Sequence, residues 1–161
     1  MGKPEAAFDK ILKKQLTKPN VSRSTALSII LSELKKKGNF LSCVLTDNNG
    51  LLMAEDLHPQ DNRDNFSASS GLITDAAEKL SDYLGVGGVS LSYFVTQTNM
   101  IWMKSIHLPD CNDRFILLAV KRNSLLSKMP KATLKLLGKE KVFIPLLLEI
   151  ASKYIREYCD E

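Results

Sequence analysis

The chain has 161 residues, of which 44% are hydrophobic and 25% are charged, proportions expected for one globular domain. No run of about 18 apolar residues predicts a transmembrane helix, and the start lacks the apolar core of a secretory signal. The three cysteines lie far apart without a CxxC pair, so structural zinc is not expected and a cytoplasmic location is predicted.

Charge is distributed unevenly along the chain. Residues 1–39 carry a net charge of +6, residues 40–120 carry −6, and residues 121–161 carry +4. Two interpretations stay open: the basic ends lie near the acidic middle, or they make weak peripheral contact with a membrane surface or another anionic partner. Nucleic acid is not an expected partner, because no basic run is interleaved with aromatic residues that stack on bases.

The first forty residues predict two helices. Residues 4–17 place four apolar side chains on one helical face, namely Phe8, Ile11, Leu12 and Leu16. Ser22 or Ser24 can cap a second helix that runs to about Lys37. Gly38 suits the left-handed position that follows the helix.

Short apolar runs then predict a β-hairpin. Residues 40–46 are apolar on both faces, which is typical of a central strand covered on both sides. Asn49 and Gly50 tolerate the positive φ angles of a tight turn, so residues 51–55 form the returning strand. The polar residues 57–65 predict a loop.

Helical spacing returns in residues 65–84. A near-heptad stripe on this helix consists of Phe66, Ser70, Ile73, Ala77, Leu80 and Leu84. Gly71 lies among small side chains, although glycine costs about 1 kcal/mol relative to alanine inside a helix. The residues alone leave two explanations for Gly71. It lets the helix pack closely on its own sheet, or it lets two such helices approach each other across a dimer.

Three antiparallel strands and a closing helix complete the pattern. The strands are predicted at residues 89–96, 100–107 and 114–121, and their short connections make them antiparallel neighbours. In the first strand, alternate positions are apolar: Val89, Leu91, Tyr93 and Val95. A short helical patch at 124–129 and a turn at Gly138 then precede a helix that begins near Ile144, because Pro145 fits the first turn of a helix.

No set of residues predicts an active site. Asp75, Glu78 and Asp82 share the polar side of the 65–84 helix, and a solvated face explains them more simply than paired catalytic carboxylates. His58 and His107 are far apart and lack the spacing of metal ligands on a helix. We therefore predict that the chain is not an enzyme and uses no metal or other cofactor.

The order of the elements defines an α+β fold, α-β-β-α-β-β-β-α, preceded by an extra N-terminal helix. From about Ser22 to the final helix, the sequence resembles the roadblock family of dynein-light-chain-like and MglB-like proteins. The resemblance rests on a leading helix that ends in Lys-Gly, on the segment LSCVLTDNNGLLMAED, and on a small-residue helix that ends in DAAEKLSDYLGVGG before three strands. It implies a five-stranded antiparallel sheet with helices on both faces, the 65–84 helix covering one and the terminal helices the other.

The resemblance also implies a division of the chain. Residues 1–20 are expected to be an amphipathic extension, residues 21–122 a roadblock-like core, and residues 123–161 an insertion with the closing helix. Family members commonly dimerise by pairing their third strands and crossing their second helices, which favours close helix approach as the role of Gly71. The dimer interface carried over by position comprises Phe66, Ser70, Gly71, Ile73, Ala77, Val89, Leu91, Tyr93 and Val95.

Members of this family serve as non-catalytic platforms for Ras-like small GTPases. We therefore expect a homodimer that binds such a GTPase and modulates its nucleotide cycle, with Asp75, Glu78 and Asp82 as the hypothetical contact. One alternative is an adaptor subunit that pairs with a different roadblock-type chain in a trafficking or motor complex. Another is a profilin-like or PAS-like domain that binds a small ligand, which would require a sizeable apolar cavity and a monomer.

Overall fold

A computed structural model describes residues 3–108, 114–122 and 132–159 of the chain. The helices are α1 (Lys3–Leu16), α2 (Arg23–Gly38), α3 (Arg63–Leu84) and α4 (Ala132–Cys159). The strands are β1 (Ser42–Asp47), β2 (Leu52–Asp56), β3 (Leu91–Val95), β4 (Asn99–His107) and β5 (Arg114–Arg122). Within these ranges, none of the helices combines the length and the apolar character needed to cross a membrane.

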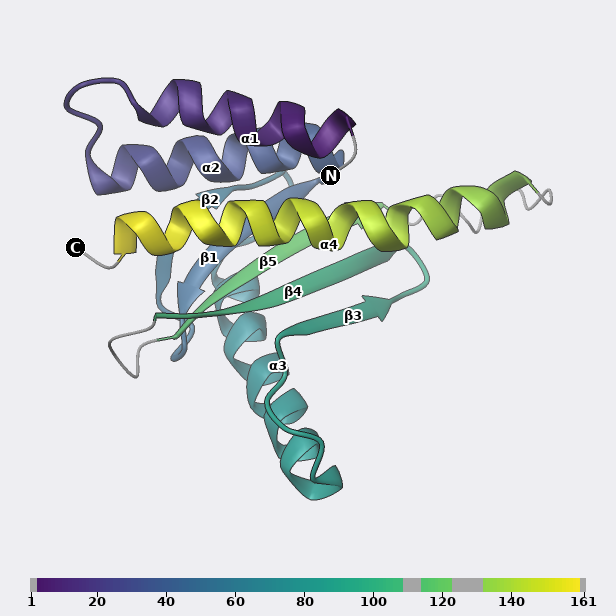
Figure 1. Cartoon of the computed structure of the whole chain (residues 1–161). Helices are drawn as coiled ribbons and strands as arrows, with labels where there is room; N and C mark the ends of the chain where they lie inside the picture. The colour runs from purple at the N-terminus through teal and green to yellow at the C-terminus, as the bar shows by residue number, and fades with distance from the viewer. Residues whose placement is uncertain (1–2, 109–113, 123–131, 160–161) are drawn as a thin grey trace.

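The five strands form one sheet in the order β2-β1-β5-β4-β3, and every neighbouring pair is antiparallel. Helix α3 lies on one face of the sheet, while α2 and α4 cover the other face and α1 lies outside them (Figure 1). This arrangement confirms the predicted fold class, the order of the elements and the extra N-terminal helix. Strand β1 is buried along almost its whole length, as its apolar pattern predicts.

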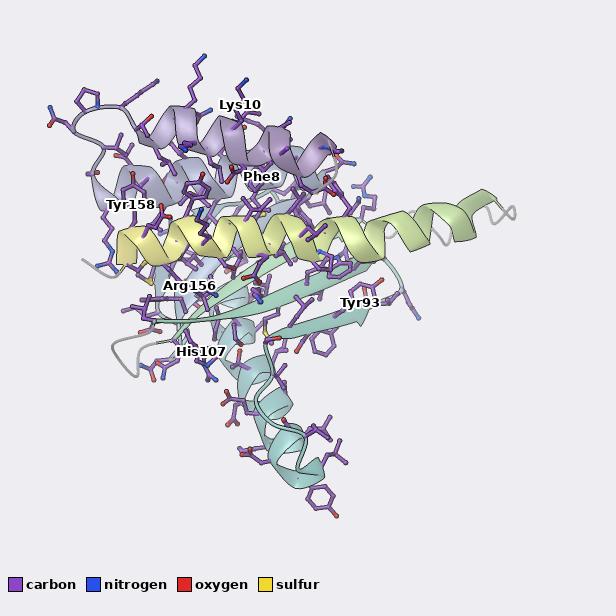
Figure 2. All side chains as sticks on the ribbon, viewed as in Figure 1. Phe8, Lys10, Tyr93, His107, Arg156 and Tyr158 are labelled. Carbon is purple, nitrogen blue, oxygen red and sulfur yellow. The ribbon has the colours of Figure 1, made fainter. Side chains whose placement is uncertain are left out.

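The main core lies between the sheet and the α1, α2 and α4 helices. The apolar side of α1 contributes Phe8, Leu12 and Leu16, all of them buried, which confirms its predicted amphipathic character. Phe8 is labelled in Figure 2. Two tyrosines of α4 also hold α1. The hydroxyl of Tyr154 donates to the Asp9 carboxylate at 3.0 Å, and that of Tyr158 donates to the Leu16 carbonyl at 3.1 Å.

The prediction for helix α2 is confirmed at its N-terminus and is wrong at its C-terminus. Ser22 is the N-cap, since its hydroxyl accepts from the Thr25 backbone N–H at 3.2 Å. At the other end Asn39, and not Gly38, adopts the left-handed conformation, with φ of 53°. The prediction for Gly38 was wrong because this residue lies inside the helix, where the Phe40 ring occupies the space that a Cβ atom would need.

The predicted hairpin between β1 and β2 is present. The Asp47 carboxylate accepts from the backbone N–H groups of Asn49 and Leu51 at 2.9 and 2.7 Å. Gly50 has φ of +83°, a conformation that side chains disfavour, so the glycine of the predicted turn has a structural role.

Helix α4 begins earlier than the sequence predicts. It starts at Ala132, so that Gly138 and Pro145 both lie inside the helix and neither the turn nor the start near Ile144 is present. Proline removes one helical hydrogen bond, but the helix continues through it because Ile144, Leu147 and other side chains are buried against the core. The helical patch predicted at 124–129 lies outside the described residues.

Candidate functional site

The first half of α3 is attached to the sheet by small polar side chains. Thr46 of β1 and Ser70 share a buried hydrogen bond of 2.9 Å, and Ser67 donates to the Gly50 carbonyl in the hairpin turn. Further along the helix, the Thr74 hydroxyl lies 3.4 Å from the Met103 sulfur of β4. The short side chains bring α3 close to the sheet here, where strand residues such as Val44 and Met103 are buried.

The second half of α3 extends beyond the sheet, and the segment after it runs back alongside the helix to β3 (Figure 1). The helix ends at Gly85, whose φ is 63° and whose N–H bonds to the Asp82 carbonyl at 3.1 Å, as expected for a glycine C-cap. Apolar side chains near this end are strongly exposed: Leu80 is 60% exposed and Tyr83 is 89% exposed. The projecting half of α3 therefore presents apolar surface that this chain does not cover.

Strand β3 is one of the two edge strands of the sheet. The other edge, β2, carries charged side chains in ion pairs: Glu55 with Arg63, and Asp56 with Lys35 at 2.6 Å. Strand β3 instead ends in exposed apolar residues, Phe94 and Val95. Charged side chains protect an edge strand against pairing with another chain, so β3 is the edge better suited to such pairing.

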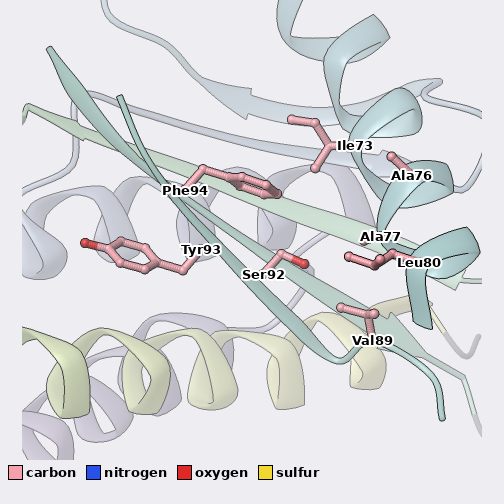
Figure 3. Close-up of a pocket in the computed structure, with 8 residues that line it drawn as sticks. All are labelled: Ile73, Ala76, Ala77, Leu80, Val89, Ser92, Tyr93 and Phe94. Carbon is pink, nitrogen blue, oxygen red and sulfur yellow. The ribbon is translucent and has the colours of Figure 1, made fainter. Parts of the chain in front are cut away.

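An apolar groove of about 440 Å³ lies between α3 and β3 (Figure 3). It is lined by Ile73, Ala76, Ala77, Leu80, Val89, Ser92, Tyr93 and Phe94. A second hollow of about 230 Å³ shares Ile73 and extends over β4 and β5, and a third of about 350 Å³ shares Leu80 and follows the segment after α3. Together the three hollows form a continuous strip along one side of α3.

The residues predicted for the dimer interface fall into different environments. Ile73, Ala77 and Val89 line the groove, and Phe66 lines the neighbouring hollow. Ser70 is fully buried within its own chain. A Cβ atom on Gly71 would lie 3.7 Å from the Asn49 carbonyl oxygen, so this glycine faces its own hairpin.

The predicted residues of β3 also divide between the two faces of the sheet. Leu91 and Tyr93 pack against the core on the α4 side, where the Tyr93 and Trp102 rings lie 4.1 Å apart between centroids. Phe94 points instead toward α3 and was missed by the sequence reasoning (Figure 3). The sequence does contain a signal for Phe94. Side chains alternate between the two faces of a strand, so Phe94 must face opposite to Tyr93.

The three acidic residues of α3 are not equivalent. Asp75 and Asp82 are exposed, and Asp75 accepts from Lys79 one turn later at 2.7 Å. Glu78 is half-buried and forms an ion pair with Arg114 of β5. At 100° per residue, Asp75 and Asp82 lie on the side of the helix opposite Ile73 and Leu80. Any partner of these two carboxylates would therefore approach α3 from the side away from the groove.

Two potentially reactive side chains of β1, Ser42 and Cys43, are buried. Cys43 is fully buried in β1, and burial raises the pKa of its thiol, so it stays protonated. The Ser42 hydroxyl donates to the Asp61 carboxylate and accepts from the His58 backbone N–H at 2.8 Å, which ties the loop after β2 to the sheet. Among residues 3–108, 114–122 and 132–159, no three His, Cys, Asp or Glu side chains converge as metal ligands.

No protein-family model matches the sequence, and a comparison with curated proteins finds no match. Solved structures do match. MglB from Myxococcus xanthus is 14% identical with a TM-score of 0.64, over 84% of this chain and 96% of MglB. An MglB with a tetrameric arrangement is 13% identical with a TM-score of 0.60, over 89% of this chain and 98% of that chain.

A Roadblock/LC7 domain from Streptomyces avermitilis also matches, at 15% identity and a TM-score of 0.55, over 83% of this chain and 98% of the domain. Sequence identities this low support a shared fold and nothing more. The order of the helices and strands in these matches agrees with the order that the sequence predicts. The chain therefore has the fold of MglB and of the Roadblock/LC7 domain, with an extra helix at its N-terminus.

Proposed function

We propose that two copies of this chain pair through β3 and α3, and that the dimer binds a Ras-like small GTPase and modulates its nucleotide cycle. The observation that carries the proposal is the apolar groove beside edge strand β3, next to the exposed half of α3. Apolar strips of this kind on a soluble domain mark protein interaction sites. The tetrameric arrangement of a similarly folded MglB supports self-association as a property compatible with this fold.

The symmetry of the proposed dimer follows from sheet geometry. Two copies of one edge strand pair antiparallel about a twofold axis perpendicular to the sheet, so each face of the joined sheet keeps its own helices. Both α3 helices would lie on one face, and each would cover the groove of its partner with exposed residues such as Leu80 and Leu84. Asp75 and Asp82 would stay exposed on the outer side of each α3, where they could contact a GTPase.

Self-association is tested with two matched leucines on α3. Leu80, 60% exposed, lines the groove, whereas Leu72, 72% exposed, lies outside the groove and both neighbouring hollows. In light scattering, Leu80→Lys should give a monomer, because it buries a charge in the interface, while Leu72→Lys should keep the mass of the dimer. A wild-type monomer at all concentrations would contradict the homodimer and leave an adaptor that pairs with a different chain.

GTPase binding is tested with variants that keep the dimer. Asp75→Lys with Asp82→Lys should abolish binding to a panel of purified Ras-like GTPases, because it reverses two exposed charges without breaking a contact to the sheet. Glu78 is tested separately, as Glu78→Gln, because reversing its charge would also break the ion pair with Arg114. Unchanged binding by the double variant would contradict the assigned contact, and no wild-type binding in either nucleotide state would contradict the proposed function.

A further inference from the structure

The exposed lysines of α1 and two exposed carboxylates of α3 lie on opposite sides of the sheet. Helix α1 lies at one extreme of the molecule and the projecting end of α3 at the other (Figure 1). The exposed carboxylates Asp75 and Asp82 belong to α3, whereas Lys10, Lys13 and Lys14 are exposed on α1. The lysines of α1 therefore lie away from these two carboxylates of α3, whereas Lys35 of α2, also in the basic start of the chain, pairs with Asp56 of the acidic middle at 2.6 Å.

Among the side chains that the structure describes, the exposed ones of α1 are small apolar residues and lysines, and Lys13 also lines a hollow with Asp9 and Glu157. These exposed residues form the outer side of α1 and are Pro4, Ala6, Ala7, Lys10, Lys13 and Lys14. Both acidic residues of the helix point elsewhere: Glu5 is buried, and Asp9 accepts from Tyr154 of α4. No described side chain forms an ion pair with the three lysines, and Lys10 points away from the body of the molecule (Figure 2).

We propose that this outer side of α1 binds the surface of membranes that contain acidic phospholipids. A helix that lies flat with lysines on one side matches a diffuse layer of negative headgroups, and each lysine near such a surface adds to the attraction. The short side chains of Ala6 and Ala7, one turn before Lys10, let the backbone lie close to the headgroups. The buried side of α1 stays in the core, so the contact is electrostatic and peripheral and requires no unfolding of the helix.

Lipid fits this surface better than nucleic acid or a phosphorylated peptide does. The exposed side of α1 has no aromatic residue on which a base could stack. It also has no arginine, the residue whose planar fork recognises individual phosphates, and lysine instead acts as a point charge. The proposal needs neither the dimer nor a GTPase, so its outcome is independent of the proposed function.

The test is flotation of the full chain with vesicles of phosphatidylcholine containing about 30% phosphatidylserine, at low salt. The wild type should float with these vesicles, stay unbound with pure phosphatidylcholine, and dissociate in about 0.5 M NaCl, where the screening length is a few ångströms. Lys10→Gln with Lys14→Gln should weaken binding by about tenfold or more, because two charges at the contact are lost.

The control is Lys79→Gln with Arg122→Gln, which removes the same charge from exposed residues outside α1. It should bind these vesicles within about twofold of the wild type, and all variants should melt at the same temperature. An equal loss of binding in both double variants would overturn the assignment to α1, since net charge alone would then explain it. Absence of wild-type flotation, or tighter binding to duplex DNA than to the vesicles, would overturn the proposal.

Discussion

The two faces of the sheet are covered in different ways. On one face, α2 and α4 bury a continuous apolar core, and α1 closes it from outside. On the other face, α3 is attached through hydroxyl contacts such as that between Thr46 and Ser70, and a groove remains open beside β3. The first face is complete within one chain, and the second presents apolar surface to a partner.

The two faces therefore contribute to different properties: the first to folding of the monomer, and the second to association with a partner. Burial of large apolar side chains is the main source of folding free energy, so the stability of the monomer depends chiefly on the α1, α2 and α4 face. Residues on the α3 face can then be suited to association without loss of the fold. Substitutions on the first face should therefore change the stability of the monomer, and substitutions on the second face should change assembly.

The largest expected contrast is between two leucines, one on each side of the sheet. Leu34 of α2 is 0% exposed in the core, whereas Leu80 of α3 is largely exposed in the groove. Leu34→Ala should lower the free energy of unfolding by about 2–5 kcal/mol through lost burial and a cavity. Leu80→Ala should change it by no more than about 0.5 kcal/mol when the chain is monomeric.

Urea unfolding at low protein concentration measures both leucine effects, and light scattering measures assembly on the same samples. Leu80→Ala should weaken the dimer while Leu34→Ala, where still folded, should not. If both substitutions destabilise the monomer equally, the α3 face belongs to the folding core and the contrast between the faces is lost.

Two glycines near the attachment of α3 should respond with opposite signs. Gly50 has φ of +83°, and a Cβ atom on it would lie 2.8 Å from the Ser67 carbonyl oxygen. Gly50→Ala should therefore destabilise the chain by about 1–3 kcal/mol. Gly71→Ala should stabilise it by up to about 1 kcal/mol, since alanine favours the helix and its Cβ would make ordinary contacts with the hairpin.

Thermal unfolding compares the two glycine variants, and the dimer dissociation constant of Gly71→Ala distinguishes the two explanations of this glycine. Packing on its own hairpin predicts an unchanged dimer. Close approach of two α3 helices predicts a weaker one, because the added methyl group would separate them. A destabilised monomer in Gly71→Ala would contradict the intramolecular packing described above.

The hydroxyl pair beneath α3 should contribute no more than Gly50→Ala costs. Thr46→Val removes one partner of a buried hydrogen bond, while the Ser70 hydroxyl keeps its bond to the Ser67 carbonyl at 2.8 Å. We expect Thr46→Val to lower the free energy of unfolding by about 1 kcal/mol. A double-mutant cycle with Ser70→Ala isolates the coupling free energy between the two hydroxyls. Zero coupling would mean that this contact does not fasten α3 to the sheet.

Local patterns in the sequence were sufficient to predict most elements. The doubly apolar run of β1, the one-sided apolar pattern of α1 and the Asn-Gly turn each depend on neighbours in the chain, so they can be recognised without the fold. The predicted end of α2 and the predicted start of α4 were wrong because both are set by packing in the folded chain and not by the local pattern. Phe40 packs where a side chain on Gly38 would lie, and core burial carries α4 through Pro145.

The groove was only partly predictable. Ile73 and Ala77 follow from the helical stripe, but the role of Leu80 depends on how far α3 extends past the sheet, and this is a property of the whole fold. Phe94 was overlooked because the strand pattern was assigned to a single apolar face. In the structure β3 has apolar residues on both faces, Leu91 toward the core and Phe94 toward α3.

A pH-dependent effect is expected where Tyr154 of α4 holds α1 on the closed face. Burial, and then the hydrogen bond to Asp9, raise the pKa of the Tyr154 phenol from 10.0 to about 12. The folded state thus favours the protonated phenol, and its stabilising contribution is complete below pH 10.0 and is lost as the pH rises toward about 12. Tyr154→Phe lacks this contribution, so the difference in unfolding free energy between wild type and variant should shrink across that range.

Urea unfolding of both proteins at several alkaline pH values measures the difference and cancels the titration of lysines common to both. A difference that stays constant with pH would mean that the Tyr154 phenol titrates alike in the folded and unfolded chain, and that its hydrogen bond to Asp9 does not help to hold α1.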